Sequence, residues 1–94
     1  MKTLMKNKLL PLGCVVATRN ADDTLFSFEI EEALRRHQNY DWGELCAEDW
    51  RANSEAVFKG DRILSSYRSV EGEQFWIITE ADRSVTTVLL PSDY

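Results

Sequence analysis

The sequence has few of the residues from which metal and redox sites are built. Its 94 residues include one histidine, His37, and two cysteines, Cys14 and Cys46, which lie far apart. A structural zinc site takes four cysteine or histidine ligands, and a disulfide framework takes several cysteines in a short secreted chain. We therefore expect no metal site and no cofactor. We interpret Cys14 and Cys46 as buried or half-buried thiols of a reducing compartment.

Long apolar runs and glycine-rich motifs are also missing. No stretch reaches the roughly 18 apolar residues of a membrane-spanning helix. The apolar segment Leu9–Leu12, which follows Lys8, is shorter than the roughly 7 to 15 residues of an export signal. No phosphate-binding glycine loop, nucleophile elbow or dinucleotide motif is present. These absences predict a cytoplasmic protein that makes no membrane contact.

The first 19 residues lack acidic side chains. They carry only basic charges, whereas residues 20–94 hold all 16 acidic and 7 of the 11 basic residues, for a charge of −9. Binding to a phosphate backbone relies on lysine and arginine, so nucleic acid is not an expected ligand. An acidic body is typical of a solvated surface or of a partner for a basic protein. We expect one domain over residues 1–94, with residues 1–9 as a flexible basic segment.

Two helices are predicted in the first two thirds of the chain. After Ser27, which we interpret as an N-cap, apolar residues and His37 recur at helical spacing. A second helix is predicted from Ala47 to Lys59, where Gly60 supplies the terminating residue. Asn20–Thr24, ahead of the first helix, is predicted to be a polar loop.

Four strands are predicted from short runs of β-branched and alternating residues: 12–18, 62–69, 74–80 and 85–90. The connections between the last three are too short for crossovers, which favours an antiparallel meander. We expect an α+β single domain in which two short helices pack on a three- to four-stranded antiparallel sheet. Phe75 and Ile77 share one face of this sheet, Trp76 and Ile78 share the other, and the pattern leaves open which face is buried.

Aromatic residues and acids gather around residues 41–50. Acids at the start of a helix stabilise it, and the aromatic turn Asp41–Gly43 is expected to be pinned to the core. The same composition is typical of interface anchors rimmed by charge. The candidate contact residues for a protein partner are Trp42, Glu44, Glu48, Asp49, Trp50, Tyr67 and Trp76.

A second hypothesis is a small hydrolase or ribonuclease that uses His37, Glu80 and Arg83. Histidine titrates near neutral pH, and an acid and a base at one end of a sheet suit general acid–base chemistry. The structural alternative for His37 is that it closes an apolar stripe and satisfies a carbonyl near the helix end. For Glu80 and Arg83 the alternative is ordinary turn chemistry.

Several blocks of the sequence resemble a family of small bacterial proteins carried on conjugative plasmids, integrative elements and phages, commonly labelled plasmid-related or hypothetical. The blocks are Asp41–Leu45, Asp49 with Asn53, Arg62–Tyr67, Trp76–Ser84, Thr86–Thr87, Leu89–Pro91 and Tyr94. The likeness runs from about Leu10 to Tyr94, although residues 19–34 depart from it. The resemblance implies an accessory protein of a mobile element, which binds a protein encoded by the host or the element and modulates host defence or regulation.

Three further expectations concern the last third of the chain, the charge of the protein and its oligomeric state. Asp61–Leu64 and the order of helices before a terminal sheet are similar to microbial ribonucleases of the barnase type, but that family's late catalytic histidine has no counterpart here. A DNA-mimicking inhibitor would need acids in uninterrupted rows, and arginines are interspersed among them: Arg35, Arg36, Arg51 and Arg62. The protein partner can also be a second copy of this chain, which would form a homodimer.

Overall fold

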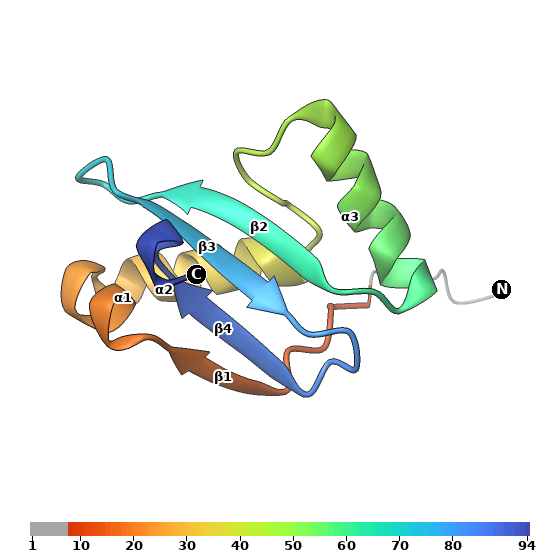
Figure 1. The fold of residues 1–94 in the computed structure, drawn as a ribbon, viewed down its shortest axis with the longest axis horizontal. Coiled ribbons are helices and arrows are strands. Elements are labelled where there is room, and N and C mark those ends of the chain that lie inside the picture. Colours follow the sequence, from red (N-terminus) through yellow and green to blue (C-terminus); the bar gives the residue numbers. More distant parts are fainter. Residues whose placement is uncertain (1–7) are drawn as a thin grey trace, which may run out of the picture.

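The computed structural model describes residues 8–94 and confirms a small α+β domain (Figure 1). The elements are β1 (Cys14–Ala17), α1 (Arg19–Thr24), α2 (Ser27–Gln38), α3 (Ala47–Lys59), β2 (Ile63–Arg68), β3 (Gln74–Thr79), β4 (Val85–Leu89) and a 3-10 helix, η1 (Pro91–Asp93). The expected flexible segment falls mainly on residues 1–7, which lie outside the described residues. Leu10 is anchored, because its N–H donates to the Gln38 carbonyl at 3.0 Å.

The sheet is mixed, in the order β1-β4-β3-β2. The β2–β3–β4 meander is antiparallel as predicted, whereas β1 runs parallel to β4, with Cys14 beside Val85 and Ala17 beside Val88. The prediction of an antiparallel sheet is therefore wrong at this edge. No hairpin joins β1 to β4, so the antiparallel direction that a short connection imposes does not apply to this pair.

The structure has a helix, α1, where a polar loop was predicted at Asn20–Thr24. Thr18 caps this helix, because its hydroxyl oxygen accepts from the N–H of Ala21 at 3.1 Å. Six residues are too few to display an apolar period, and only Ala21 of this helix is buried. The helix therefore depends on its cap and its packing, which a periodicity argument does not detect.

The two longer helices match their predictions closely. Helix α2 starts at Ser27, but the N-cap position is Phe26, one residue earlier than predicted. The Phe26 N–H is satisfied from inside the helix, by Glu29 Oε1 at 3.0 Å. Helix α3 ends as predicted at Gly60, whose φ of 76° is the left-handed conformation that glycine adopts readily.

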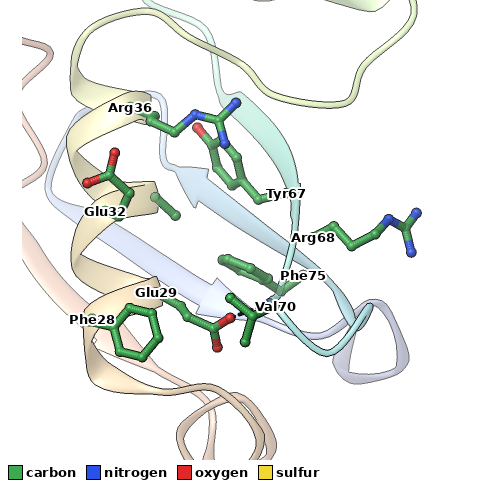
Figure 2. Close-up of a pocket in the computed structure, with 9 residues that line it drawn as sticks. Phe28, Glu29, Glu32, Arg36, Tyr67, Arg68, Val70 and Phe75 are labelled. Atoms are coloured by element: carbon green, nitrogen blue, oxygen red, sulfur yellow. Dashed lines mark hydrogen bonds between the residues drawn. The ribbon is translucent and has the colours of Figure 1, made fainter.

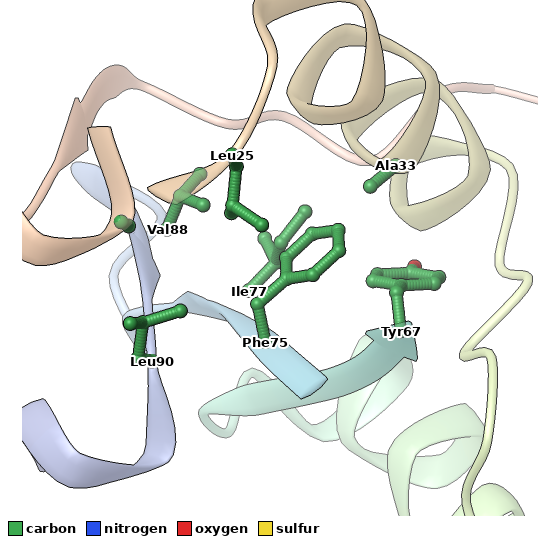
Figure 3. Close-up of a cluster of buried hydrophobic side chains, with 8 residues drawn as sticks. Leu25, Ala33, Tyr67, Phe75, Ile77, Val88 and Leu90 are labelled. Atoms are coloured by element: carbon green, nitrogen blue, oxygen red, sulfur yellow. The ribbon is translucent and has the colours of Figure 1, made fainter. Parts of the chain in front are cut away.

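One face of the sheet packs against α2, which lies behind it in Figure 1, and α1 joins the same packing from beyond the end of β1. Buried side chains of this face, the two helices and the segment between them form one cluster (Figure 3): Ala21, Leu25, Ala33, Tyr67, Phe75, Ile77, Val88 and Leu90. Phe75 and Ile77 are therefore inside, and Trp76 and Ile78 lie on the opposite face. The Tyr94 ring covers part of that opposite face, with its centroid 5.8 Å from the Trp76 centroid.

A second, smaller cluster lies between α3 and β2: Leu10, Trp42, Ala56 and Ile63. Trp42 is 0% exposed, which confirms that the Asp41–Gly43 turn is pinned to the core. Gly43 has a φ of 78°, and a Cβ at this position would lie 2.0 Å from the Ser66 carbonyl oxygen. Only glycine permits this close approach of the turn to β2.

Helix α3 and the turn before it cover the outer edge of β2. Asn53 Nδ2 donates to the Leu64 carbonyl at 2.5 Å, and the Leu64 N–H donates to Asn53 Oδ1 at 3.3 Å. The Ser66 N–H donates to the Trp42 carbonyl at 3.1 Å, and the Ser66 carbonyl accepts from the Glu44 N–H at 2.7 Å. The outward backbone groups of Leu64 and Ser66 are thus satisfied, which closes this edge.

Replacing Asn53 by alanine is expected to open the β2 edge. The Leu64 N–H and C=O would both lose their partner, so the free energy of unfolding should fall by about 1–3 kcal/mol in urea denaturation. Hydrogen exchange at the Leu64 amide should accelerate more than exchange elsewhere in β2. The control is Arg51→Ala on the exposed side of the same helix, with an expected change within about 0.5 kcal/mol. Equal effects of the two variants would contradict the edge-closing role.

Candidate functional site

A cleft lies between α2 and the β2–β3 hairpin, and we call it the α2–hairpin cleft (Figure 2). Its volume is about 160 Å³, and it is lined by Phe28, Glu29, Glu32, Ala33, Arg36, Tyr67, Arg68, Val70 and Phe75. An apolar cavity of about 150 Å³ holds a benzene molecule, whereas sites for drug-sized ligands occupy roughly 300–1,000 Å³. The cleft is therefore sized for one apolar side chain.

A buried carboxylate fixes the width of the α2–hairpin cleft. Glu29 is only 8% exposed, and its Oε2 accepts from the N–H of Val70 at 2.5 Å while its Oε1 accepts from that of Phe26. Figure 2 shows Glu29 reaching from α2 toward Val70 in the hairpin turn. Because one carboxylate holds both walls, the cleft is formed before any ligand arrives.

Arg36 forms the upper wall of the cleft. Its guanidinium lies 4.8 Å from the Tyr67 ring centroid, and its Nε donates to Asp41 Oδ2 at 2.8 Å. This hydrogen bond raises the pKa of Arg36 and lowers the pKa of Asp41. The Tyr67 hydroxyl donates to the Asp41 carbonyl at 2.7 Å, and burial raises the pKa of Tyr67 well above its usual range. Asp41 therefore holds both Arg36, which forms a wall of the cleft, and Tyr67, which forms part of its floor.

The rim of the cleft is apolar and exposed. Phe28 is 60% exposed and Val70 is 70% exposed, and the Phe26 ring stacks on Phe28 with centroids 5.5 Å apart. Arg68 lies at the polar side of the rim, where its guanidinium pairs with Glu44 at 3.3 Å. Exposed apolar side chains gathered around a hollow are typical of interaction sites.

The predicted contact residues do not gather in one place. Tyr67 forms part of the cleft floor, and Glu44 reaches the rim through its pair with Arg68. Trp42 is enclosed in the second cluster, so its ring is not available to a partner at the surface. Trp50 is half-buried against the same cluster and does not line the cleft.

The remaining predicted contact residues lie elsewhere. Glu48 and Asp49 are exposed in the first turn of α3, where they stabilise the helix start. Trp76 is half-buried on the sheet face opposite α2, edge-on to Tyr94. None of the three lines the α2–hairpin cleft.

Sequence reasoning missed the exposed apolar rim residues Phe26, Phe28 and Val70. The available signal was Phe28, which falls outside the apolar stripe that α2 directs at the sheet. An aromatic residue off the buried stripe of a helix is exposed unless a loop covers it. Val70 carried no comparable signal, because its place beside α2 depends on the hairpin's position in the fold.

His37 is buried and belongs to a hydrogen-bond chain. Its Nδ1 lies 2.5 Å from Ser65 Oγ, and its Nε2 lies 2.9 Å from Thr79 Oγ1. Thr79 Oγ1 lies 2.8 Å from Thr86 Oγ1, and the Thr86 hydroxyl donates to the Leu12 carbonyl at 2.7 Å. We call this set the His37 hydrogen-bond chain. It joins α2 to three strands and to the segment before β1.

The direction of each bond in this chain follows from its last acceptor. A carbonyl only accepts, so the single Thr86 proton goes to Leu12, and Thr86 in turn accepts from Thr79. Thr79 then accepts from Nε2–H of His37. In the neutral ring the unprotonated Nδ1 accepts from Ser65. Burial, with a smaller contribution from Arg83, lowers the pKa of His37 from 6.5 to about 4.

The three side chains of the hydrolase hypothesis do not meet at a surface. His37 is 0% exposed. The Glu80 carboxylate lies 3.6 Å from Arg62, and the Arg83 guanidinium donates to backbone carbonyls, including that of Asp61 at 2.7 Å. Arg83 thus ties the β3–β4 turn to the segment after α3. His37 and Arg83 thus contribute to holding the fold in place, whereas Glu80 forms a half-exposed ion pair.

Both cysteines are exposed, so the expectation of buried or half-buried thiols is wrong. Cys14 lies on β1, an edge strand whose four side chains are all exposed. Cys46 is the N-cap of α3, and its sulfur accepts from the N–H of Asp49 at 3.4 Å. Helix caps lie at the surface, which explains the exposure of this second thiol.

Within residues 8–94, no three side chains of histidine, cysteine, aspartate or glutamate are placed to hold a metal ion. No helix in this part of the chain combines the length and hydropathy needed to cross a bilayer. No protein-family model matches the chain, and neither a curated protein nor a solved structure is detectably similar to it. The resemblance to proteins of plasmids and phages therefore stays a prediction.

The His37 hydrogen-bond chain predicts a loss of stability in mild acid. Below pH 6.5 the unfolded chain takes up a proton that the folded chain excludes down to about pH 4. The free energy of unfolding should therefore fall as the pH decreases through this window, by about 1.6 kcal/mol between pH 6.5 and pH 5. Urea denaturation at several pH values measures this change. His37 is the only histidine, so the slope is assignable to one group.

A neutral replacement and a spectroscopic measurement provide the controls. His37→Asn should lower stability but abolish most of the pH dependence between pH 6.5 and pH 5. In the wild-type protein, ¹⁵N shifts of the imidazole should report a proton on Nε2 and none on Nδ1 at pH 7. A titration midpoint near 6.5 in the folded protein would contradict the buried, neutral assignment.

Removing the Glu29 carboxylate is expected to loosen the α2–hairpin cleft. Glu29→Ala leaves the N–H groups of Phe26 and Val70 without their charged acceptor, so the free energy of unfolding should fall by about 2–3 kcal/mol. Glu29→Gln, which keeps one acceptor oxygen, should cost less. Glu32→Ala, one turn along the same helix and exposed, is the control, with an expected change within about 0.5 kcal/mol. A neutral Glu29→Ala would refute the bridging role.

Proposed function

We propose that this chain is a protein-binding module whose α2–hairpin cleft receives an apolar side chain of its partner. The observation that supports this proposal is the combination of an apolar hollow of about 160 Å³ with the exposed side chains of Phe28 and Val70 beside it. A preformed hollow saves the entropy of ordering a site on binding. Aromatic anchors seated in such hollows supply most of the energy of many interfaces.

The arrangement of charges around the cleft suggests that a partner binds there mainly through apolar contacts. The charged rim side chains already have partners within the chain, since Arg36 pairs with Asp41 and Arg68 pairs with Glu44. At longer range, the charge of −9 over residues 20–94 favours a basic partner and accelerates its encounter. The partner chemistry that fits best is a basic protein that presents an exposed aromatic or aliphatic side chain.

The sequence resemblance supplies a biological setting for this proposal. Blocks such as Asp41–Leu45 and Trp76–Ser84 resemble accessory proteins of plasmids, integrative elements and phages. In that setting the partner is a protein of the bacterial cytoplasm, encoded by the host or by the element, and the binding modulates host defence or regulation.

The two alternative functions have less support. A hydrolase that uses His37, Glu80 and Arg83 would need His37 at the surface, and its ring is enclosed. A DNA mimic would need rows of unpaired acids, whereas several acids of this chain have a base beside them: Glu32, Asp41, Glu44, Glu55 and Glu80.

Selection from a random peptide library tests the binding proposal. Peptides selected on wild-type protein should share one aromatic or large aliphatic residue, and Phe28→Ala should weaken their binding by at least about tenfold. The melting temperature should stay unchanged, because Phe28 is exposed. Phe58→Ala is the matched control, since Phe58 is also a helical phenylalanine and is 90% exposed on α3. Its substitution should leave peptide binding intact.

Two outcomes would reject the cleft as the binding site. The first is a set of selected peptides that binds Phe28→Ala as tightly as wild type. The second is a set of peptides whose binding changes the NMR chemical shifts of residues away from Phe28, Arg68 and Val70. A selection that enriches no peptide would count against peptide binding altogether.

A further inference from the structure

The outer edge of β1 carries backbone groups without a partner. The N–H of Cys14 donates to the Ser84 carbonyl at 2.9 Å, and that of Thr18 donates to the Val88 carbonyl at 3.0 Å. In a parallel ladder alternate residues direct their backbone groups to the same neighbour. Val15 therefore directs its N–H and C=O away from β4, as does Ala17. No residue among 8–94 forms a hydrogen bond with these four groups.

The two edges of the sheet differ in a way that points to an interface. Asn53 and the turn before α3 cover the edge at β2, whereas nothing in the described chain covers β1. Natural proteins protect open edges with lysine, proline or a bulge, and Cys14–Ala17 contains none of these. All four side chains are exposed, and Val15 and Val16 are 44% and 42% exposed. An apolar strand of this kind is a template for another strand.

We propose that β1 pairs in antiparallel fashion with β1 of a second copy of this chain, joining two four-stranded sheets into one. A two-fold axis at Val16 would place Val15 of each copy opposite Ala17 of the other. The outward N–H and C=O groups of both residues would then be satisfied in both copies. The two Val16 side chains would form the central pair without hydrogen bonds, where side chains approach closely.

The charges at the ends of β1 favour a second copy in this direction. Arg19 follows the strand at its C-terminal end. Asp82 lies beside the N-terminal end of β1. The Asp82 carboxylate accepts from the N–H of Ser84, and the Ser84 carbonyl accepts from the N–H of Cys14, the first residue of β1. Antiparallel pairing brings Arg19 of one copy toward Asp82 of the other at both ends of the interface. A parallel pairing would instead bring the two Arg19 side chains together.

Sedimentation equilibrium of the full chain tests this pairing. In reductant and about 0.15 M salt, which screens the net charge of the two copies, wild-type protein at about 100 µM should have about twice the 10.9 kDa mass of one chain. Val15→Pro should be monomeric, because proline removes an outward N–H while the bonds to β4 come from the neighbouring residues. Val15→Thr, which keeps the N–H and suits a strand, is the control and should remain dimeric.

A second variant keeps the test decisive if Val15→Pro does not fold. Val16→Asp places two like charges at the two-fold axis, while the exposure of Val16 in one chain lets the fold tolerate the change. Val16→Asp should therefore be monomeric with an intact circular dichroism spectrum. A folded Val16→Asp that dimerises as well as wild type would overturn the proposed pairing.

Cross-linking tests the register. In a chain without its native thiols, Cys14→Ser with Cys46→Ser, the further change Val16→Cys should give a covalent dimer on mild oxidation, because central pairs lie close enough for a disulfide. Thr87 lies beside Val16 on β4 and is therefore one strand further from the axis, so Thr87→Cys should give no covalent dimer. A monomeric wild type would overturn the proposal, and a monomer that binds an added strand-forming peptide at β1 would assign the edge to another protein.

Discussion

The His37 hydrogen-bond chain is the constraint on which the rest of the structure depends. A buried imidazole without partners would cost several kcal/mol, so the sequence must supply a hydroxyl on each side of it. Ser65 and Thr79 do so from adjacent strands, and Thr86 passes the chain on to Leu12. Each hydroxyl has one proton, so the order of donors is fixed. The C-terminal end of α2 can therefore occupy only one position on the sheet.

The position of α2 explains why a cleft opens beside it. His37 holds one end of the helix over the sheet, and Glu29 holds the other end to the hairpin turn. Between these two polar anchors the helix presents Ala33, a small side chain, toward Tyr67 and Phe75. The helix cannot move inward to fill the space, because both of its ends are bonded. An apolar hollow beneath Phe28 is the result.

Features that depend on local sequence could be predicted, and features that depend on distant contacts could not. The apolar period of α3 and the glycine that ends it are local, and the short turns of the β2–β4 meander are local too. The parallel direction of β1 has no local signal, because its neighbour β4 is among the last elements of the chain. The exposure of Cys14 follows from that same edge position. Likewise, Tyr67 could be predicted as a contact residue because it is aromatic, whereas Val70, which completes the cleft, could not be predicted from its residue type.

The sheet order relates the cleft to the open edge. The cleft lies at β2 and β3, whereas β1 is at the other end of the order β1-β4-β3-β2. Pairing through β1 would therefore leave the cleft of each copy open, at the two far ends of a continuous sheet. Two linked sites bind a repeated or dimeric partner more tightly than either site alone, because the second contact becomes intramolecular. Because each cleft is sized for one side chain, linking two of them would raise the affinity for such a partner.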